Sequence, residues 1–196
     1  MKNLFLNLTF AFAAISFVAF TGVLDSKKVS TINSKVVWKG YKVTGSHEGT
    51  INLKSGDLQF ENGMLKGGSF VIDMTTIKVT DTQGKAGTSL EGHLSSPDFF
   101  GVEKFPEASL TIKQVVSRGT PGDYKVVADI TIKETTKEIK FMTKVSEEMG
   151  KMTATSDITI DRSDFNVRYG SGSFFEDLGD KTIYDEFELS IQLVTE

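Results

Sequence analysis

Apolar and polar residues alternate along most of the chain beyond residue 35. Between residues 124 and 133, Tyr124, Val126, Ala128, Ile130 and Ile132 occupy every second position, and the residues between them are mostly charged or polar. A period of two is typical of a strand with one buried face. Its recurrence predicts about eight strands joined by short turns. The predicted fold class is all-β, an antiparallel meander that closes into a barrel and leaves no unpaired edge.

Glycine, proline and asparagine mark the predicted turns. Asn62-Gly63 is the strongest two-residue hairpin signal in the chain. Further turns are predicted at residues 44–49, Ser55-Gly56, 121–123 and 147–150. Residues 80–88 are polar and contain two glycines, so they are predicted to form a loop.

Residues 90–106, with the sequence LEGHLSSPDFFGVEKFP, do not alternate. Ser96 followed by Pro97 has the pattern of an N-cap and a first helical residue, which predicts one or two helical turns that begin there. Pro106 favours an extended Phe105 and a new strand. The segment is predicted to be a short, aromatic, partly helical plug that closes one end of the barrel. A connector whose aromatic residues complete the core is an equal alternative.

The first residues indicate export. Lys2 precedes an almost continuous apolar run from residue 4 to residue 20, and a polar stretch follows. This is the layout of a secretory signal peptide, expected over residues 1–24 with a cut between Phe20 and Lys28. A membrane anchor is the competing interpretation, and it is less favoured because no second apolar anchor follows.

Composition narrows the classes of partner. The 196-residue chain has a formal net charge of -4, which becomes -5 without residues 1–24, because these contain Lys2 and no acidic residue. A negative charge argues against nucleic acid as a partner. Without cysteine, the chain has no disulfide and no lipid-modified cysteine. The remainder fits one domain, expected over residues 30–194.

Candidate catalytic groups are few. There is no cysteine nucleophile and no G-x-S-x-G motif. His47 and His93 are interpreted as barrel-end histidines that donate to backbone carbonyls, and a metal site is less favoured. Arg162, flanked by Asp161 and Asp164, is interpreted as part of a surface or strand-end ion-pair cluster. No catalytic residue, metal ligand or cofactor is predicted.

Two features leave alternatives open. Residues 168–185 are too long for a hairpin turn, and they form either a flap over the barrel mouth or an ordered loop that tucks Phe174 and Phe175 into the core. The apolar inward positions fit a ligand-binding interior and a tightly filled scaffold equally well. Trp38, the only tryptophan, is interpreted as a core anchor rather than a ligand platform.

Several motifs in order carry a family resemblance. The pieces are Trp38, Gly40 and Val43; residues 45–49; Gly56, Leu58 and Phe60; residues 67–74 with Ile77 and Asp81; residues 93–106; residues 129–133 with Thr136 and Lys137; and residues 161–165. Together they span residues 30–194, and HLSSPDFFGVEKFP is the most specific of them. The chain resembles the YceI-like family, often called polyisoprenoid-binding proteins.

The resemblance implies a lipocalin-like, extended antiparallel eight-stranded barrel with an apolar pore. It also implies a long isoprenoid or other long-chain amphiphilic lipid as ligand and a periplasmic location. Membrane contact is expected to be only transient. A homodimer is one option for self-association. The function expected is sequestration or carriage without turnover. The alternatives are an enzyme that uses His47, His93 or Asp164 on a bound lipid or amide, and a ligand-free envelope stress or interaction protein with a filled barrel.

The residues expected to line the pore are apolar or aromatic. They come mainly from the inward face of residues 124–132 and from equivalent positions on other strands. The set is Phe70, Ile72, Phe99, Phe100, Tyr124, Val126, Ile130, Ile132, Phe141 and Leu189.

Overall fold

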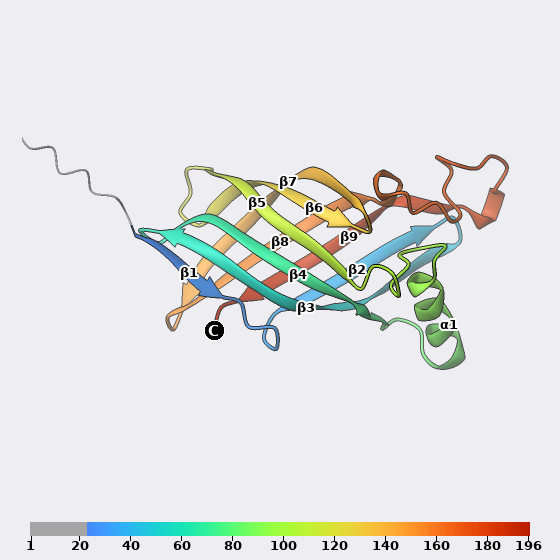
Figure 1. The fold of residues 1–196 in the computed structure, drawn as a ribbon, viewed down its shortest axis with the longest axis horizontal. Coiled ribbons are helices and arrows are strands. Elements are labelled where there is room, and N and C mark those ends of the chain that lie inside the picture. Colours follow the sequence, from blue (N-terminus) through green and yellow to red (C-terminus); the bar gives the residue numbers. More distant parts are fainter. Residues whose placement is uncertain (1–22) are drawn as a thin grey trace, which may run out of the picture.

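The structure, a computed structural model, describes residues 23–196. One antiparallel sheet closes into an elongated barrel of eight strands, and a short ninth strand is added at one edge (Figure 1). Among the described residues, a single α-helix stands at one end of the barrel. The predicted all-β barrel is therefore confirmed. The expected signal peptide lies almost entirely outside the described residues.

The strands follow the chain in order around the barrel, with one exception near the N-terminus. The strands are β1 (Leu24–Lys28), β2 (Lys35–Lys42), β3 (Gly45–Glu61), β4 (Met64–Val79), β5 (Glu107–Ser117), β6 (Asp123–Ile132), β7 (Thr135–Glu148), β8 (Lys151–Asp161) and β9 (Ile183–Val194). The helices are α1 (Gly84–Ser95) and two short 3₁₀ helices, η1 (Arg162–Phe165) and η2 (Gly179–Lys181).

Strand β3 is shared between several neighbours. Along one edge its first part pairs with β2, and its last residues pair with β1. Along the other edge it pairs with β4, and this pairing closes the barrel. Strand β2 also pairs with β9, so the sheet continues through β9, β8, β7, β6 and β5 back to β4. The closed order leaves most backbone groups of the sheet paired, as a barrel requires.

The hairpin at Asn62-Gly63 is confirmed. Asn62 and Gly63 have φ angles of 53° and 75°, which two-residue turns of this hand require at both positions. Met149 and Gly150, with φ angles of 51° and 79°, connect β7 to β8 in the same way. These turns match the right-handed twist of the strands that they join.

The turn predicted at Ser55-Gly56 is wrong, because β3 runs through it without a break. A register shift between Leu53 and Ser55 absorbs the irregularity as a β-bulge. A Cβ atom on Gly56 would lie 2.6 Å from the ring of Phe70. Glycine is therefore needed here for a close approach between strands and not for a turn. The turn expected over residues 44–49 is likewise shorter, because β3 already begins at Gly45.

The helix lies earlier in the chain than predicted. Residues 84–88, expected in a loop, form the first part of α1, and Ser96 ends the helix instead of starting one. The hydroxyl of Ser96 donates to the backbone carbonyl of His93, 2.7 Å away. Pro97 follows because proline is common just after a helix end, where it cannot continue the helix. The strand expected after Pro106 is confirmed as β5.

Gly49 is a position where we expect a single methyl group to destabilise the fold. A Cβ atom there would collide with the carbonyl oxygen of Lys78 and lie 2.5 Å from Cζ2 of Trp38. Gly49→Ala should lower the free energy of unfolding by about 1–3 kcal/mol, the usual cost of overpacking. Urea unfolding followed by Trp38 fluorescence measures the change. Gly92→Ala is the control, because a Cβ atom at Gly92 meets nothing within 4 Å. An unchanged midpoint for Gly49→Ala would contradict the expected clash.

Candidate functional site

The barrel encloses a cavity of about 390 Å³ in the half that carries α1. The volume is in the range of ligand sites in proteins. Inward side chains of β2, β4, β6, β8 and β9 form most of the wall, and most of them are aliphatic or aromatic. Trp38, Ile72, Ile130 and Leu189 represent four of these strands. Such a wall suits a hydrocarbon chain, because burial of apolar surface from water is favourable.

The other half of the barrel is filled by side chains. Leu58, Phe60 and Leu65 are each 2% exposed, and Val126 is fully buried. The hydroxyl of Tyr124 crosses this region and accepts a hydrogen bond from the backbone N–H of Leu65, at 3.3 Å. The cavity is therefore blind at the end opposite to α1. The segment predicted as a plug, residues 90–106, stands at the other end of the barrel and contributes Leu90, His93, Leu94, Phe99 and Phe100 to the cavity wall.

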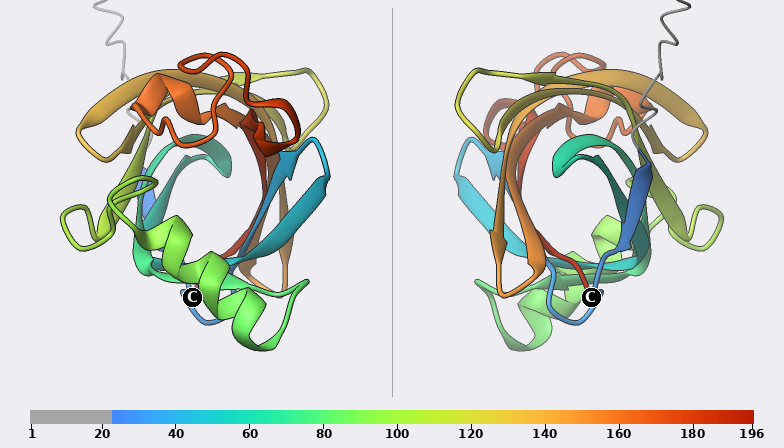
Figure 2. Two further views of the ribbon diagram at one scale, coloured as in Figure 1. Left: turned by 90° about the vertical axis from the view of Figure 1, so that its right-hand side faces the viewer. Right: turned by 90° about the vertical axis from the view of Figure 1, so that its left-hand side faces the viewer.

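The end that carries α1 is called the mouth. Figure 2 shows α1 lying across one side of this end and the loop after η1 on the opposite side. The Glu91 carboxylate fixes α1 to β4, because it accepts hydrogen bonds from the Val79 backbone N–H and from Lys78 Nζ, each at 3.0 Å. Both bonds lower the pKa of Glu91, and the bond from the Val79 backbone N–H has the larger effect. Leu90 and Leu94 of the same helix line the cavity.

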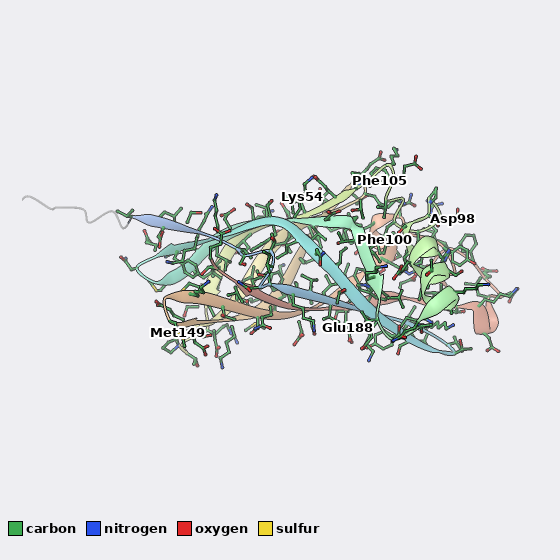
Figure 3. The ribbon with its side chains drawn as sticks, turned by 90° about the horizontal axis from the view of Figure 1, so that it is seen from below. Lys54, Asp98, Phe100, Phe105, Met149 and Glu188 are labelled. Atoms are coloured by element: carbon green, nitrogen blue, oxygen red, sulfur yellow. The ribbon has the colours of Figure 1, made fainter. Side chains whose placement is uncertain are left out.

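The residues after α1 place aromatic rings at the cavity wall. Phe99 and Phe100 pack edge to face, with ring centroids 5.0 Å apart. Phe100 also contacts Phe187 of β9 at 6.4 Å, and Figure 3 shows Phe100 at the same end of the barrel as α1. Edge-to-face packing is a favourable arrangement of aromatic rings. The segment predicted as a plug therefore forms part of the cavity wall near the mouth.

Both histidines line the cavity at its polar end. His47 Nδ1 lies 3.0 Å from Oδ2 of Asp81. His93 Nε2 is buried and has no hydrogen-bond partner, and the ring packs edge to face against Phe99 and Tyr169, with centroids 5.6 Å and 4.3 Å away. The expected bonds to backbone carbonyls are therefore wrong for these two ring nitrogens. In the described part of the chain, no group of three or more His, Asp or Glu side chains is arranged to hold a metal ion.

Arg162 also lines the cavity and is 2% exposed, so it is not a surface residue. Of the two expected settings, a surface or a strand-end ion pair, the strand-end one applies, because Arg162 directly follows β8. Its Nε, Nη1 and Nη2 donate to the backbone carbonyls of Tyr184, Val167 and Ile183 at 3.1, 2.8 and 2.9 Å. Nη2 also forms an ion pair with Oδ1 of Asp185 at 3.2 Å, without the alignment of a hydrogen bond. Burial lowers the pKa of Arg162, and the nearby carboxylates oppose this effect. The guanidinium stays charged at neutral pH.

The loop at residues 168–182 does not tuck its phenylalanines into the core. Phe174 and Phe175 are 39% and 49% exposed. The loop is anchored by Ser173, whose hydroxyl donates to Asp185 Oδ2 at 2.6 Å, and by the Ile183 N–H, which donates to the carbonyl of Gly170. Tyr169 at the start of the loop lines the cavity. The loop therefore lies beside the mouth, with its two phenylalanines partly in solvent.

The ten residues predicted to line the pore divide into two groups. Six of them line the cavity: Ile72, Phe99, Phe100, Ile130, Ile132 and Leu189. The other four do not, and they pack in the core of the barrel: Phe70, Tyr124, Val126 and Phe141. All five inward residues of β6 are buried, so the face of β6 that was predicted to line the pore does face the barrel interior. The division arises because the cavity occupies only one half of the barrel axis.

Several cavity residues were not among those predicted. Trp38 lines the cavity, and its indole N–H donates to the carbonyl of Thr50 at 3.3 Å. Gly40, two residues further along the same face, also lines the cavity, and a Cβ atom there would meet nothing within 4 Å. The alternation of Val36, Trp38 and Gly40 was visible in the sequence and places the three on one face. Nothing in the sequence marked Arg162 as buried.

The comparisons with known proteins agree with the geometry. The YceI-like domain matches residues 23–195 of the chain. BcnA of Burkholderia cenocepacia superposes with a TM-score of 0.69 at 20% identity, covering 86% of this chain and 99% of its own. A polyisoprenoid binding domain from Saccharophagus degradans, implicated in plant cell wall breakdown, superposes with a TM-score of 0.65 at 14% identity. The match covers 89% of this chain and 99% of its own.

A third solved structure covers the whole chain. The YceI protein of Campylobacter jejuni gives a TM-score of 0.55 at 16% identity, covering 100% of this chain and 99% of its own. At these identities the three structures establish the fold. No curated protein matches the chain significantly. None of the helices in the described residues has the length and apolar character needed to span a membrane.

Proposed function

The chain belongs to the YceI-like family, and from this membership and the blind apolar cavity we propose that it binds an isoprenoid or another long-chain amphiphilic lipid. The observation that carries the proposal is the polarity of the cavity wall. Apolar side chains line its length, whereas His47, His93 and Arg162 gather at the mouth. A lipid would enter tail first and leave its polar end at the mouth. The solved Saccharophagus degradans relative is described as a polyisoprenoid binding domain, which is consistent with this choice.

Burial of the tail supplies the binding energy. Each buried methylene contributes about 0.8 kcal/mol, so a chain of several isoprene units needs no charged contact along the wall to bind. The filled half of the barrel stops the lipid tail at Val126 and its neighbours, which limits the length of tail that enters. The role proposed is sequestration or carriage, in which the lipid leaves chemically unchanged.

The alternatives fit the geometry less well. A filled, ligand-free barrel is disfavoured by the cavity of about 390 Å³. An enzyme that uses His47, His93 or Asp164 would need these groups to converge on one reacting centre. Asp164 is instead paired with Lys137 Nζ at 3.0 Å, and His47 is paired with Asp81. Binding without turnover is the simpler use of the cavity.

We also propose export to the periplasm through the signal peptide at the N-terminus. Strand β1 begins at Leu24 and pairs with β3 along its whole length. A cut between residues 20 and 23 would retain this strand, whereas a cut after Lys28 would remove it. We therefore favour the earlier part of the expected range. Mass spectrometry of the mature protein from a periplasmic extract tests both the location and the cut.

The experiment that tests the proposed ligand is native mass spectrometry of the mature protein purified from its own cell envelope. The expected result is a stoichiometric adduct that denaturing extraction identifies as an isoprenoid or acyl compound. The same preparation, stripped of lipid, should then take up geranylgeraniol in a titration of Trp38 fluorescence, because Trp38 lines the cavity. A protein without adduct that also fails to bind any long-chain lipid in this titration would overturn the proposal.

The exposed phenylalanines beside the mouth suggest how a lipid is loaded. We propose that Phe174 and Phe175 touch a bilayer transiently during transfer, as aromatic side chains do at membrane interfaces. Phe174→Ser combined with Phe175→Ser should slow transfer of geranylgeraniol from phosphatidylcholine vesicles by about tenfold, since two apolar contacts are lost. The equilibrium affinity for the free lipid should stay unchanged, because neither ring lines the cavity.

Met149→Ser is the matched control for this prediction. Met149 is fully exposed in the β7–β8 turn, and Figure 3 shows it at the end of the barrel opposite to the mouth. Its replacement removes a similar amount of exposed apolar surface without touching the mouth. Equal transfer rates for the double variant and the control would show that the loop plays no part in loading.

A further inference from the structure

His93 has an unsatisfied ring nitrogen at the polar end of the cavity. Nε2 is buried and has no partner, although an imidazole nitrogen can donate or accept one hydrogen bond. The ring is held between Phe99 and Tyr169. A buried polar atom without a partner costs free energy, and buried polar groups are usually paired. Tyr169 packs against the ring and is 48% exposed, so a ligand atom that displaced it and reached Nε2 would supply the missing partner.

The buried cation in the described part of the cavity wall, Arg162, already has partners. The Arg162 guanidinium donates to three backbone carbonyls and faces the Asp185 carboxylate, as described above. His47 faces Asp81 at 3.0 Å. Lys42 lies at the rim and its side chain is exposed. A phosphate or diphosphate buried beside His93 would therefore lose its hydration without gaining an uncompensated buried cation, which is unfavourable.

From these observations we infer that the site at the mouth takes an uncharged polar head group, an alcohol or carbonyl oxygen that forms a hydrogen bond with His93 Nε2. The inference rests on the proposed lipid-binding function and narrows its ligand class. The ligand is then a neutral amphiphile such as a polyprenol, not a polyprenyl phosphate. His93 contributes the single hydrogen bond that orients it, and the apolar wall contributes most of the affinity.

The first test compares three ligands that share one branched carbon skeleton on the intact mature protein: the unsaturated geranylgeraniol and geranylgeranyl diphosphate, and the saturated hydrocarbon phytane. Titration of Trp38 fluorescence gives each dissociation constant. We expect geranylgeraniol to bind about tenfold more tightly than either of the others, since one buried hydrogen bond changes affinity by about that factor. Diphosphate binding that equals or exceeds alcohol binding would overturn the inference and leave the proposed function intact. Failure of all three ligands to bind would overturn the proposed function itself.

The second test assigns the hydrogen bond to His93. His93→Phe keeps an aromatic ring between Phe99 and Tyr169 but removes the nitrogen. It should abolish the preference for geranylgeraniol over phytane, and the urea unfolding midpoint of the variant shows separately that the barrel is folded. His93→Leu is the second apolar variant and should behave alike, whereas His93→Gln, which keeps a hydrogen-bonding group, should restore part of the preference. A preference for the alcohol that survives in both apolar variants would exclude His93 as the partner.

Discussion

Gly40→Leu should abolish lipid binding and leave the protein folded. Gly40 lies opposite His47 of β3 and Phe187 of β9, which both line the cavity, so a side chain at this position points inward. No atom lies within 4 Å of the position that its Cβ would take. A leucine there would fill space that the lipid tail needs. We expect the affinity for geranylgeraniol to fall at least about a hundredfold, the effect of excluding three to four methylene groups at about 0.8 kcal/mol each.

Gly172→Leu is the control for the blocked cavity. Gly172 is exposed in the loop beside the mouth, and a Cβ atom there also meets nothing within 4 Å. It adds the same side chain outside the cavity, so binding should match that of the unaltered protein. Urea unfolding should give a similar or higher midpoint for Gly40→Leu, because new apolar contacts replace empty space. Unchanged lipid affinity in a folded Gly40→Leu protein would place the ligand somewhere other than this cavity.

The period-two pattern predicted which side chains face the interior but not where they lie along the barrel axis. Val126 and Ile130 belong to the same inward face of β6. Only Ile130 reaches the cavity, whereas Val126 is surrounded by the filled half. Filling depends on side chains such as Leu58 and Phe60, which arrive from another strand far away in sequence. Local alternation contains no information about that meeting, so four predicted lining residues lie outside the cavity.

The bounds of α1 show a second limit of prediction from the sequence. A serine followed by a proline occurs both where helices begin and just after they end. In this chain the Ser96 hydroxyl closes α1 through the carbonyl of His93. The preceding residues 84–88 are polar and include two glycines, and the resulting weak helix propensity hid the helix in the sequence. Packing of Leu90 and Leu94 at the cavity, together with the Glu91 contacts to β4, outweighs that propensity.

Arg162 shows why the burial of a charged side chain could not be predicted from its neighbours in the sequence. Its neighbours Asp161 and Asp164 predicted a surface or strand-end ion-pair cluster, whereas the ion pair forms with the distant Asp185. The partners that bury it come from the turn after η1 and from the start of β9, about twenty residues further along the chain. Such long-range carbonyl partners leave no local sequence signal. The guanidinium therefore joins three segments of the mouth, and its loss should be costly.

Arg162→Met should lower the free energy of unfolding by about 3–5 kcal/mol, the usual cost of removing one partner from a buried ionic group. Methionine fills a similar volume but donates no hydrogen bond. The carbonyls of Val167, Ile183 and Tyr184 would lose their donors, and Asp185 would keep a buried carboxylate oxygen without its ion pair. Urea unfolding followed by Trp38 fluorescence measures the loss, because the single tryptophan reports on the barrel.

Arg168→Met is the matched control, since Arg168 is exposed and packs over the ring of Phe174 in the same region. An exposed substitution of this kind should change stability by no more than about 0.5 kcal/mol. Arg162→Lys separates charge from geometry, because lysine keeps the positive charge but cannot present the planar fork that reaches three carbonyls. We expect Arg162→Lys to recover only part of the loss. An Arg162→Met protein as stable as the Arg168→Met protein would show that the three carbonyls find other donors, and that the mouth does not depend on this guanidinium.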